Sequence, residues 1–437
     1  MKIIQWNKLD QIGKNAVLNR PVSGNKDQIK KSVLEILSNV KTDGDEALKA
    51  YSLEFDKVDL SSIKVTENDF LIASKTTSPK KQKMLQDAID RIQYFHKELL
   101  PKPQKIDTND GVICTKIYRP IQNVGLYVPG GSAPLISTLM MLAIPAQIAK
   151  CPIRIVCTPP DKNGKINPLI LLAAKLCGVT EVYKVGGAQA IAAMAYGTES
   201  IPKVDKIYGP GNSWVTEAKQ IISQEDCCVG IDMPAGPSEV LVVADKKANP
   251  VFVAADLLAQ AEHGPDSQAI LVTDNDTLGR QVIIEIEKQI LTLSRKNILA
   301  ESSKQIKVIV TNNINEAIEV SNQYAPEHLI IQTIDSSKHV EKVTAAGSIF
   351  IGAWAPEALG DYVTGSNHVL PTYGYAKNVS GLSTTDFMTS ISVQEVSIDG
   401  IRNIGPLAMD IANIEGLDAH RNAIKYRLEA IGCADVI

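Results

Sequence analysis

Apolar residues recur at helical spacing through the first hundred positions of the chain. Between Ile29 and Val40 they stand three or four residues apart, and a second helix is expected over Asp45 to Tyr51. A longer amphipathic pattern runs from Met84 to Phe95 and ends before Pro101. His96 borders the apolar stripe of this helix, so we interpret it as a structural histidine.

The pattern changes at Val112, where short apolar runs begin to alternate with helical patterns. A second series of such runs follows Ser238. This alternation predicts an α/β fold with mostly parallel sheets, and the two series suggest two sheet domains. The expected strands are Val124–Val128, Ile153–Cys157, Val182–Val185 and Lys206–Tyr208, then Val240–Ala244, Ala269–Thr273, Lys307–Thr311, Leu329–Gln332 and Ser348–Ile351.

The alternation of strands and helices is lost after about Pro371. Residues 374–381 are typical of a loop, and two closing helices are expected over Asn403–Ile414 and Gly416–Ile431. A tail of this size is too small to fold alone. It must therefore pack on the chain's own body or on another subunit.

Size and composition favour a multidomain globular enzyme. The chain has 437 residues, of which 44% are apolar and 22% charged, and its net charge is -4. Basic residues are scattered, which argues against a nucleic-acid surface, and no apolar run is long enough to span a membrane. The seven cysteines include no C-x-x-C, and the N-terminus lacks a secretory signal. We therefore expect a cytoplasmic protein with reduced thiols.

Glycine-rich turns follow several of the expected strands, at Tyr127 to Ser132, Gly186 to Gln189 and Gly209 to Asn212. Glycines where a strand leads into a helix allow backbone N–H groups to approach a phosphate. The G-x-G-x-x-G fingerprint of a standard dinucleotide site is absent from the sequence. A nucleotide site and a set of simple tight turns both fit these residues.

A metal site is one interpretation of the run Gln260-Ala-Glu-His263-Gly-Pro, which closes a helix expected over Pro250 to His263. Gln260 and His263 are three positions apart, so an amide oxygen and an imidazole nitrogen share one helix face. Zinc needs at least four donors. The candidates for the remaining donors are Asp361, His368 and His420. Sequence spacing does not choose among them. A polar helix end without a metal fits the same pair.

An acid–base pair is the corresponding interpretation of a second run, Tyr324-Ala-Pro-Glu327-His328, which precedes an expected strand. Adjacent side chains diverge in helices and strands, so both can serve one pocket only if the backbone is irregular here. A histidine accepts protons readily at neutral pH, and a glutamate with a raised pKa can deprotonate water. The alternative is a pair of solvated loop residues.

Together these segments resemble the histidinol dehydrogenase family, and the resemblance extends over nearly the whole chain. No position that matches a functional residue of the family departs from its pattern. The segments that carry the resemblance are Val124–Pro134, Val185–Ala192, Lys206–Asn212, Ile231–Glu239, Ala259–Gln268, Asn322–Leu329, Gly365–Thr372 and Glu415–Arg421.

The resemblance implies a role for each candidate residue. One zinc ion would be bound by Gln260, His263, Asp361 and, from the neighbouring subunit of a homodimer, His420. The acid–base residues would be Glu327 and His328. The residues that contact NAD would be Tyr127, Gln189 and Asn212. The substrate would contact the metal ligands together with Ser238, His328 and Glu415.

The resemblance also implies a fold and a reaction. Two incomplete Rossmann-like sheet domains are expected, one formed by residues 21–123 and 239–373 and interrupted by the other at 124–238. An N-terminal extension would span residues 1–20, and a C-terminal helical extension, 374–437, would be exchanged with the partner. The reaction would convert L-histidinol through L-histidinal to L-histidine with two NAD, the last steps of histidine biosynthesis. The alternatives are a zinc- and NAD-dependent dehydrogenase of another small alcohol, and a zinc hydrolase that needs no nicotinamide.

Overall fold

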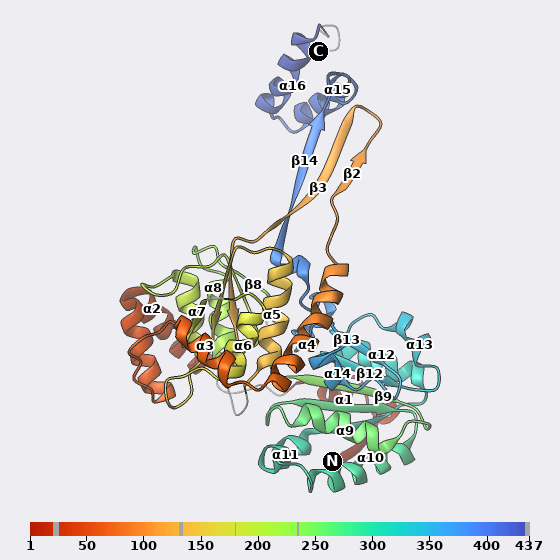
Figure 1. The fold of residues 1–437 in the computed structure, drawn as a ribbon. Coiled ribbons are helices and arrows are strands. Elements are labelled where there is room, and N and C mark those ends of the chain that lie inside the picture. Colours follow the sequence, from red (N-terminus) through yellow and green to blue (C-terminus); the bar gives the residue numbers. More distant parts are fainter. Residues whose placement is uncertain (21–25, 131–133, 180, 234–235, 433–437) are drawn as a thin grey trace. The chain divides into compact units, whose positions relative to one another are not determined.

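The structure is a computed structural model that describes residues 1–20, 26–130, 134–179, 181–233 and 236–432 (Figure 1). Gly131 and Ser132 of the first glycine-rich turn lie outside these ranges. Contacts divide the chain into two compact units, Met1–Leu99 with Ile121–Phe387, and Leu100–Pro120 with Met388–Ile437. The predicted α/β class is confirmed, because both sheets of the first unit are parallel. The finer domain boundaries expected above stay predictions.

The larger sheet of the first unit has six parallel strands in the order β1-β11-β10-β9-β12-β13. Their bounds are β1 Lys2–Gln5, β11 Lys307–Val310, β10 Gln268–Thr273, β9 Glu239–Ala244, β12 His328–Gln332 and β13 Ser348–Ile351. Every residue of β9 is buried. Val240 and Val242 pack on one face, whereas Leu241 and Val243 pack on the other. This continuous apolar run is therefore explained by helices on both faces of the sheet.

Helices from two parts of the chain cover the six-stranded sheet. On one face lie α9 (Pro250–Ala261) and α10 (Asp276–Ile290), and on the other lies α12 (Ile314–Tyr324). The first residues, for which the sequence predicted no element, form β1 and α1 (Gln11–Leu18), and β1 pairs in parallel with β11. The N-terminal segment thus packs on the chain's own sheet.

The second sheet of the first unit has five parallel strands in the order β6-β5-β4-β7-β8. Their bounds are β6 Glu181–Tyr183, β5 Ile153–Cys157, β4 Asn123–Tyr127, β7 Lys206–Tyr208 and β8 Gly230–Ile231. Every strand predicted in the two series is present, with ends that differ by at most two residues. The helices packed around this sheet are α2 Lys26–Tyr51, α3 Glu67–Thr76, α4 Pro79–Glu98, α5 Ile136–Ile148, α6 Pro168–Leu176, α7 Gly187–Tyr196 and α8 Ser213–Ile222.

Two predictions about the early helices are confirmed. The helix α2 is broken at Gly44, whose φ of 52° separates the two expected helical segments. His96, near the end of α4, is fully buried, and its Nδ1 lies 3.2 Å from the Thr384 hydroxyl. His96 is therefore a core residue, as its place beside the apolar stripe indicated.

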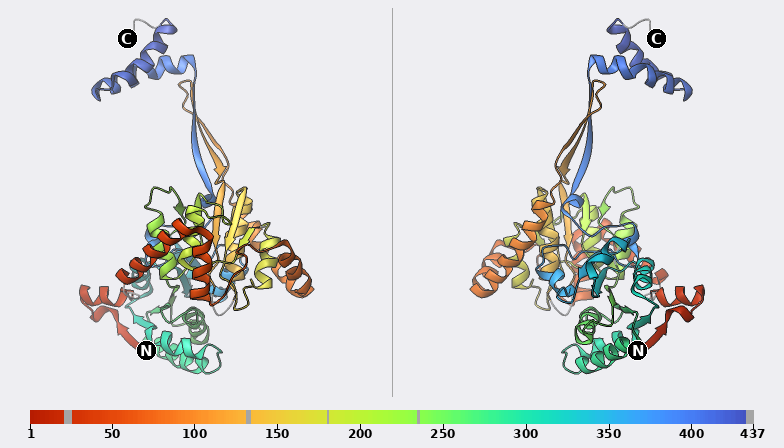
Figure 2. Two further views of the ribbon diagram at one scale, coloured as in Figure 1. Left: turned by 90° about the vertical axis from the view of Figure 1, so that its left-hand side faces the viewer. Right: turned by 90° about the vertical axis from the view of Figure 1, so that its right-hand side faces the viewer.

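The second unit contains an antiparallel sheet that the sequence did not predict. Its strands are β2 (Gln104–Asp107), β3 (Val112–Pro120) and β14 (Met388–Val396), in the order β14-β3-β2. Figure 2 shows β3 and β14 side by side along their whole length. The expectation that parallel βαβ pairing begins at Val112 is wrong for β3, whose partners are both antiparallel.

The same unit ends in the two expected helices, α15 (Ile398–Ile414) and α16 (Asp418–Ala430). Large apolar side chains of α15 are exposed, including Leu407, Ile411 and Ile414, the last with 86% of its surface accessible. Exposed apolar residues at such spacing are typical of a surface that another polypeptide covers.

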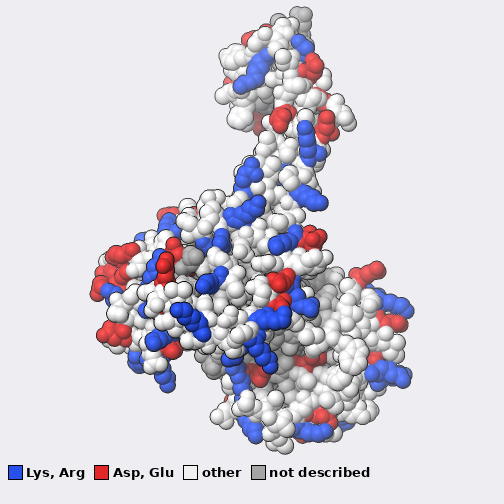
Figure 3. All heavy atoms as spheres, in the orientation of Figure 1, with Lys and Arg blue, Asp and Glu red and all other residues white. Residues whose placement is uncertain are grey.

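On the face shown in Figure 3, acidic and basic side chains are interspersed. This agrees with the small net charge of the sequence. Within the described ranges, no helix has both the length and the apolar character needed to cross a membrane.

Candidate active site

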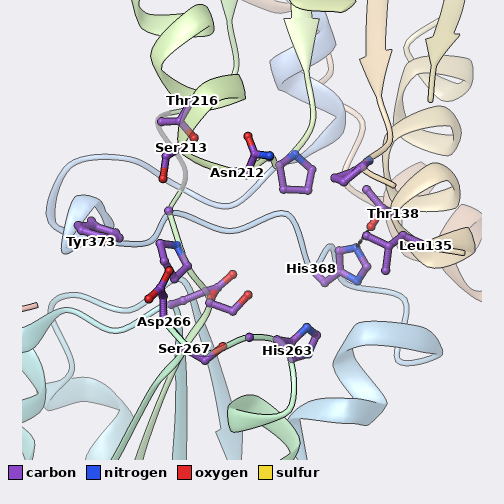
Figure 4. Close-up of a pocket in the computed structure, with 18 of the residues that line it drawn as sticks. Leu135, Thr138, Asn212, Ser213, Thr216, His263, Asp266, Ser267, His368 and Tyr373 are labelled. Carbon is purple, nitrogen blue, oxygen red and sulfur yellow. Dashed lines mark hydrogen bonds between the residues drawn. The ribbon is translucent and has the colours of Figure 1, made fainter. Parts of the chain in front are cut away.

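A cavity of about 780 Å³ lies in the first unit, and eight of the residues singled out from the sequence line it (Figure 4). The five-stranded sheet reaches it with the carboxyl ends of its strands, whereas the six-stranded sheet reaches it with the amino ends. The predicted residues in the lining are Tyr127, Asn212, Ser238, Gln260, His263, Glu327, His328 and Asp361. His368, a candidate that spacing could not assign, also lines the cavity.

A group of potential metal donors forms where α9 meets α14 (Glu357–Tyr362). Single donor atoms of His263, Glu357 and Asp361 all lie within 4.8 Å of one another. The predicted helix to His263 is slightly too long, since α9 ends at Ala261. A hydrogen bond of 3.3 Å from the His263 N–H to the Gln260 carbonyl extends the turn by two residues. His263 therefore projects from a loop into the cavity, as Figure 4 shows.

Gln260 gives the strongest indication that a further group belongs here. The residue is fully buried, and neither its amide oxygen nor its amide nitrogen has a hydrogen-bond partner among the described residues. A buried amide without partners costs about 1–3 kcal/mol, so such groups are normally satisfied. A cation held by the amide oxygen together with His263 and Asp361 would meet this requirement. Mixed oxygen and nitrogen donors suit zinc.

Glu357 was missed from the sequence, although a signal was available. It lies four residues before Asp361 on α14, a spacing that places both carboxylates on one helix face. Its side chain is buried, and burial raises its pKa well above the ordinary range. One carboxylate oxygen of Glu357 lies 3.6 Å from the His328 Nδ1 atom. The helix α14 thus supplies two acids to the site.

Glu327 and His328 are oriented by the backbone of Glu239 at the start of β9. The Glu239 N–H donates to a Glu327 carboxylate oxygen at 2.8 Å, and the His328 Nδ1 lies 3.1 Å from the Glu239 carbonyl oxygen. Because a carbonyl only accepts, Nδ1 carries the proton and Nε2 has a free lone pair. The predicted irregular backbone is present, since Ala325 adopts a left-handed φ of 54°.

Burial dominates the electrostatics of this pair. Desolvation lowers the pKa of His328 to about 3 and raises the pKa of Glu327 well above its usual range. It also raises the pKa of Asp361, 3.8 Å from the His328 Nε2, to about 6. His328 is therefore neutral at physiological pH, and its Nε2 has no hydrogen-bond partner among the described residues. The raised pKa of Glu327 means that burial favours its protonated form.

His368, Glu415 and His420 are placed differently from the residues above. The His368 Nδ1 donates to the Asp361 carbonyl oxygen at 2.9 Å, and its Nε2 lies 3.4 Å from the Thr138 hydroxyl, the dashed contact in Figure 4. Glu415 and His420 are exposed residues of the second unit, and neither lines the cavity. The described residues thus bring together all the predicted metal and acid–base groups except His420.

A second cavity of about 670 Å³ collects the glycine-rich turns. Gln189 lines it, and Tyr127 and Asn212 line both cavities. The Tyr127 hydroxyl accepts from the Gly187 N–H at 3.0 Å, and Asn212 caps α8 through bonds of 3.1 Å to two backbone N–H groups. A side chain at Gly209 would meet the Tyr127 carbonyl oxygen at 2.1 Å, so only glycine allows this close approach.

Comparison with known proteins identifies the family. The family model described as histidinol dehydrogenase matches residues 19–428. A histidinol dehydrogenase of Legionella pneumophila is 50% identical over 99% of this chain and 100% of its own length. One of Xanthomonas euvesicatoria is 49% identical over 98% and 99% of the two chains. The crystal structure of histidinol dehydrogenase from Elizabethkingia anophelis aligns with a TM-score of 0.94 and 45% identity over 98% of each chain. The chain therefore belongs to the histidinol dehydrogenase family, as its sequence motifs predicted.

Proposed function

We propose that this protein oxidises L-histidinol through L-histidinal to L-histidine, using two NAD⁺ and one zinc ion per subunit. The observation that carries the proposal is the cavity in which an acid–base pair, a group of metal donors and two residues of the glycine-rich turns converge. Family membership supports the substrate, since the relatives bear the name histidinol dehydrogenase. The cysteines in the described part of the chain are unpaired, which supports a reducing, cytoplasmic location.

The zinc site would combine three donors of one subunit with one of its partner. The donors in the cavity are Gln260, His263 and Asp361, and their support is the unpartnered Gln260 amide beside the clustered donor atoms. The fourth donor would be His420 of the partner subunit. Two observations support an exchanged tail in a homodimer: His420 is exposed on α16, and the apolar side chains of α15 are uncovered.

The dinucleotide would bind across the two cavities. Tyr127 and Asn212 line both of them, so a cofactor there would extend from the glycine-rich turns towards His328. Gln189, at the start of α7, would contact it from the second cavity. Ser238, beside the acid–base pair, would contact the substrate, together with Glu415 of the partner subunit.

In the first oxidation the neutral His328 Nε2 removes the hydroxyl proton of the alcohol. Bound NAD⁺ would accept the hydride, and a zinc ion held by Gln260, His263 and Asp361 would keep the substrate in place. The products of this step are L-histidinal, NADH and one proton. The Glu239 carbonyl keeps the His328 ring in the tautomer that this proton transfer requires.

The aldehyde has no second hydride to transfer until water adds to it. Glu327 takes the proton of that water, and His328 accepts the hydroxyl proton of the hydrated aldehyde, whose hydride a second bound NAD⁺ would accept. The products are L-histidine, NADH and two protons. Glu327 is 6% exposed, so the proposed base itself is largely shielded from bulk solvent.

The test is the amount of NADH formed per L-histidinol consumed, followed at 340 nm with and without a chelator. We expect two NADH per substrate, lost on chelation and restored by added Zn²⁺. One NADH would mean that the reaction stops at the aldehyde, which would contradict the role of Glu327. No NADH at all would refute the proposal and favour a dehydrogenase of another alcohol or a hydrolase.

A further inference from the structure

A buried ion pair joins the N-terminal segment to the strand that orients the acid–base residues. Arg20, two residues beyond the end of α1, binds the Glu239 carboxylate with both ends of its guanidinium fork, Nε to Oε1 at 2.5 Å and Nη2 to Oε2 at 2.9 Å. The Glu239 side chain is inaccessible to solvent, and that of Arg20 is 14% exposed. Two-point pairing of this kind fixes orientation as well as distance.

The same guanidinium holds the loop that leads to Glu327. Nη2 of Arg20 also donates to the Tyr324 carbonyl at 2.9 Å and to the Ala325 carbonyl at 3.3 Å. The guanidinium lies 3.9 Å from the centre of the Tyr324 ring. These carbonyls belong to the end of α12, where helical hydrogen bonding stops and outside donors are needed. Arg20 therefore binds both β9 and the irregular backbone before β12.

The backbone of Glu239 contacts the proposed acid–base residues directly. Its N–H holds the Glu327 carboxylate and its carbonyl holds the His328 ring. Its side chain also accepts the Tyr373 N–H at 3.0 Å, which ties in a loop that lines the cavity. Without Arg20 a buried carboxylate would lose its counter-charge, and burial already raises the pKa of Glu239 against the opposing effect of Arg20.

We infer that Arg20 and Glu239 are positioning residues for the reaction. Their ion pair sets the distance between β9 and the 324–328 loop, and hence the orientation of Glu327 and His328. This inference rests on the roles proposed above for those two residues. It also gives the N-terminal segment a function that its sequence pattern did not reveal.

The experiment compares three full-length, zinc-loaded variants with the wild type. Arg20→Met removes the charge and the fork, while Arg20→Lys keeps the charge but loses the fork. The matched control is Arg154→Met, because Arg154 is also partly buried and donates to two backbone carbonyls, those of Cys151 and Gly178, on the other sheet. Two quantities are measured: steady-state kinetics, and hydrogen exchange of the peptide that contains the Glu239 amide.

For Arg20→Met we expect kcat to fall by about 10- to 100-fold, the size of effect that a displaced reacting group causes, with little change in KM for L-histidinol. The Glu239 amide should exchange at least about tenfold faster, since its bond to Glu327 opens more often. Arg20→Lys should recover part of both losses. Arg154→Met should leave kcat and this peptide's exchange at the wild-type values.

An unchanged kcat or an unchanged exchange rate in Arg20→Met would overturn the inference, as would equal effects of Arg154→Met. If Arg20→Met does not fold, the inference is tested by kcat and the Glu239 amide exchange rate of Arg20→Lys. A wild-type protein that forms no NADH from L-histidinol would refute the proposed function alone. Faster exchange of the Glu239 amide in Arg20→Met would still support the positioning role in that case.

Discussion

Replacing Glu327 with glutamine should separate the two oxidations, because the change removes a proton acceptor and little else. Glutamine has nearly the same shape, and its side-chain oxygen can accept the Glu239 N–H that now lies 2.8 Å from the carboxylate. Burial raises the pKa of Glu327 well above its usual range, so an uncharged amide is favoured over an ionised carboxylate there. We therefore expect Glu327→Gln to be at least as stable to heat as the wild type.

The magnitude follows from what is lost at each step. A general base contributes about 10²- to 10⁴-fold to a rate. That range corresponds to about 3–5 kcal/mol of activation free energy. The loss should fall on the oxidation of L-histidinal, which needs water to be deprotonated. Oxidation of L-histidinol should change by no more than about threefold, since His328 keeps its bond to the Glu239 carbonyl.

The assay measures the two half-reactions separately. L-Histidinal with NAD⁺ reports the second oxidation, and L-histidinol with an aldehyde-trapping amine reports the first. The matched control is Asp256→Asn, which neutralises another buried acid that does not line the cavity. Equal losses in the two half-reactions of Glu327→Gln would refute the division of roles. A loss in Asp256→Asn would show that buried charge alone controls the rate.

Three further changes test other parts of the structure. His420→Ala should lose zinc and weaken the dimer, as measured by metal content and sedimentation; a zinc-replete variant would remove His420 from the ligands. Burial raises the pKa of Asp256 from 3.8 to about 7, so the folded protein loses stability as pH rises through that value. Asp256→Asn should recover up to about 4 kcal/mol of stability above pH 7 and little below pH 4. The measurement is the melting temperature of the variant and the wild type as a function of pH. Lys219→Met removes the cationic partner of the buried Asp232 carboxylate, which also accepts the Gly209 N–H of a glycine-rich turn. The change should cost about 3–5 kcal/mol of stability in urea unfolding and raise the KM for NAD⁺, whereas the double change with Asp232→Asn should recover most of the lost stability.

The strands of the first unit could be predicted because burial on both faces leaves a continuous apolar signature. In β9 every position is apolar after Glu239, and the prediction missed only the first residue. The strand β14 could not be found in this way, since most of its residues are exposed. Its pairing with β3, more than 250 residues away, is set by tertiary contacts that no local pattern records.

The residues of the candidate site also differ in whether a local sequence pattern reveals them. Two pairs of candidate residues lie close together in the sequence, Glu327 with His328 and Gln260 with His263. Their chemistry could therefore be recognised from short runs. Glu357 was detectable by its helical spacing from Asp361 but carries no distinctive motif. Arg20 could not have been found, because its role depends on contact with a carboxylate 219 residues away. On the proposed roles, the residues that touch the reacting atoms are thus easier to recognise in the sequence than the residues that position them.

The balance of charge around His328 bears on the proposed roles of Glu327, Arg20 and a cation. Glu239, Glu327 and Glu357 are all buried near the ring, and Arg20 pairs with the first of them. Burial raises the pKa of the other two well above the ordinary range, which favours their protonated forms. To act as the proposed base Glu327 would have to be ionised, and a second positive charge nearby would favour that form. A divalent cation bound by His263 and Asp361 would supply this positive charge in the cavity. The same ion would hold the substrate and lower the pKa of Glu327.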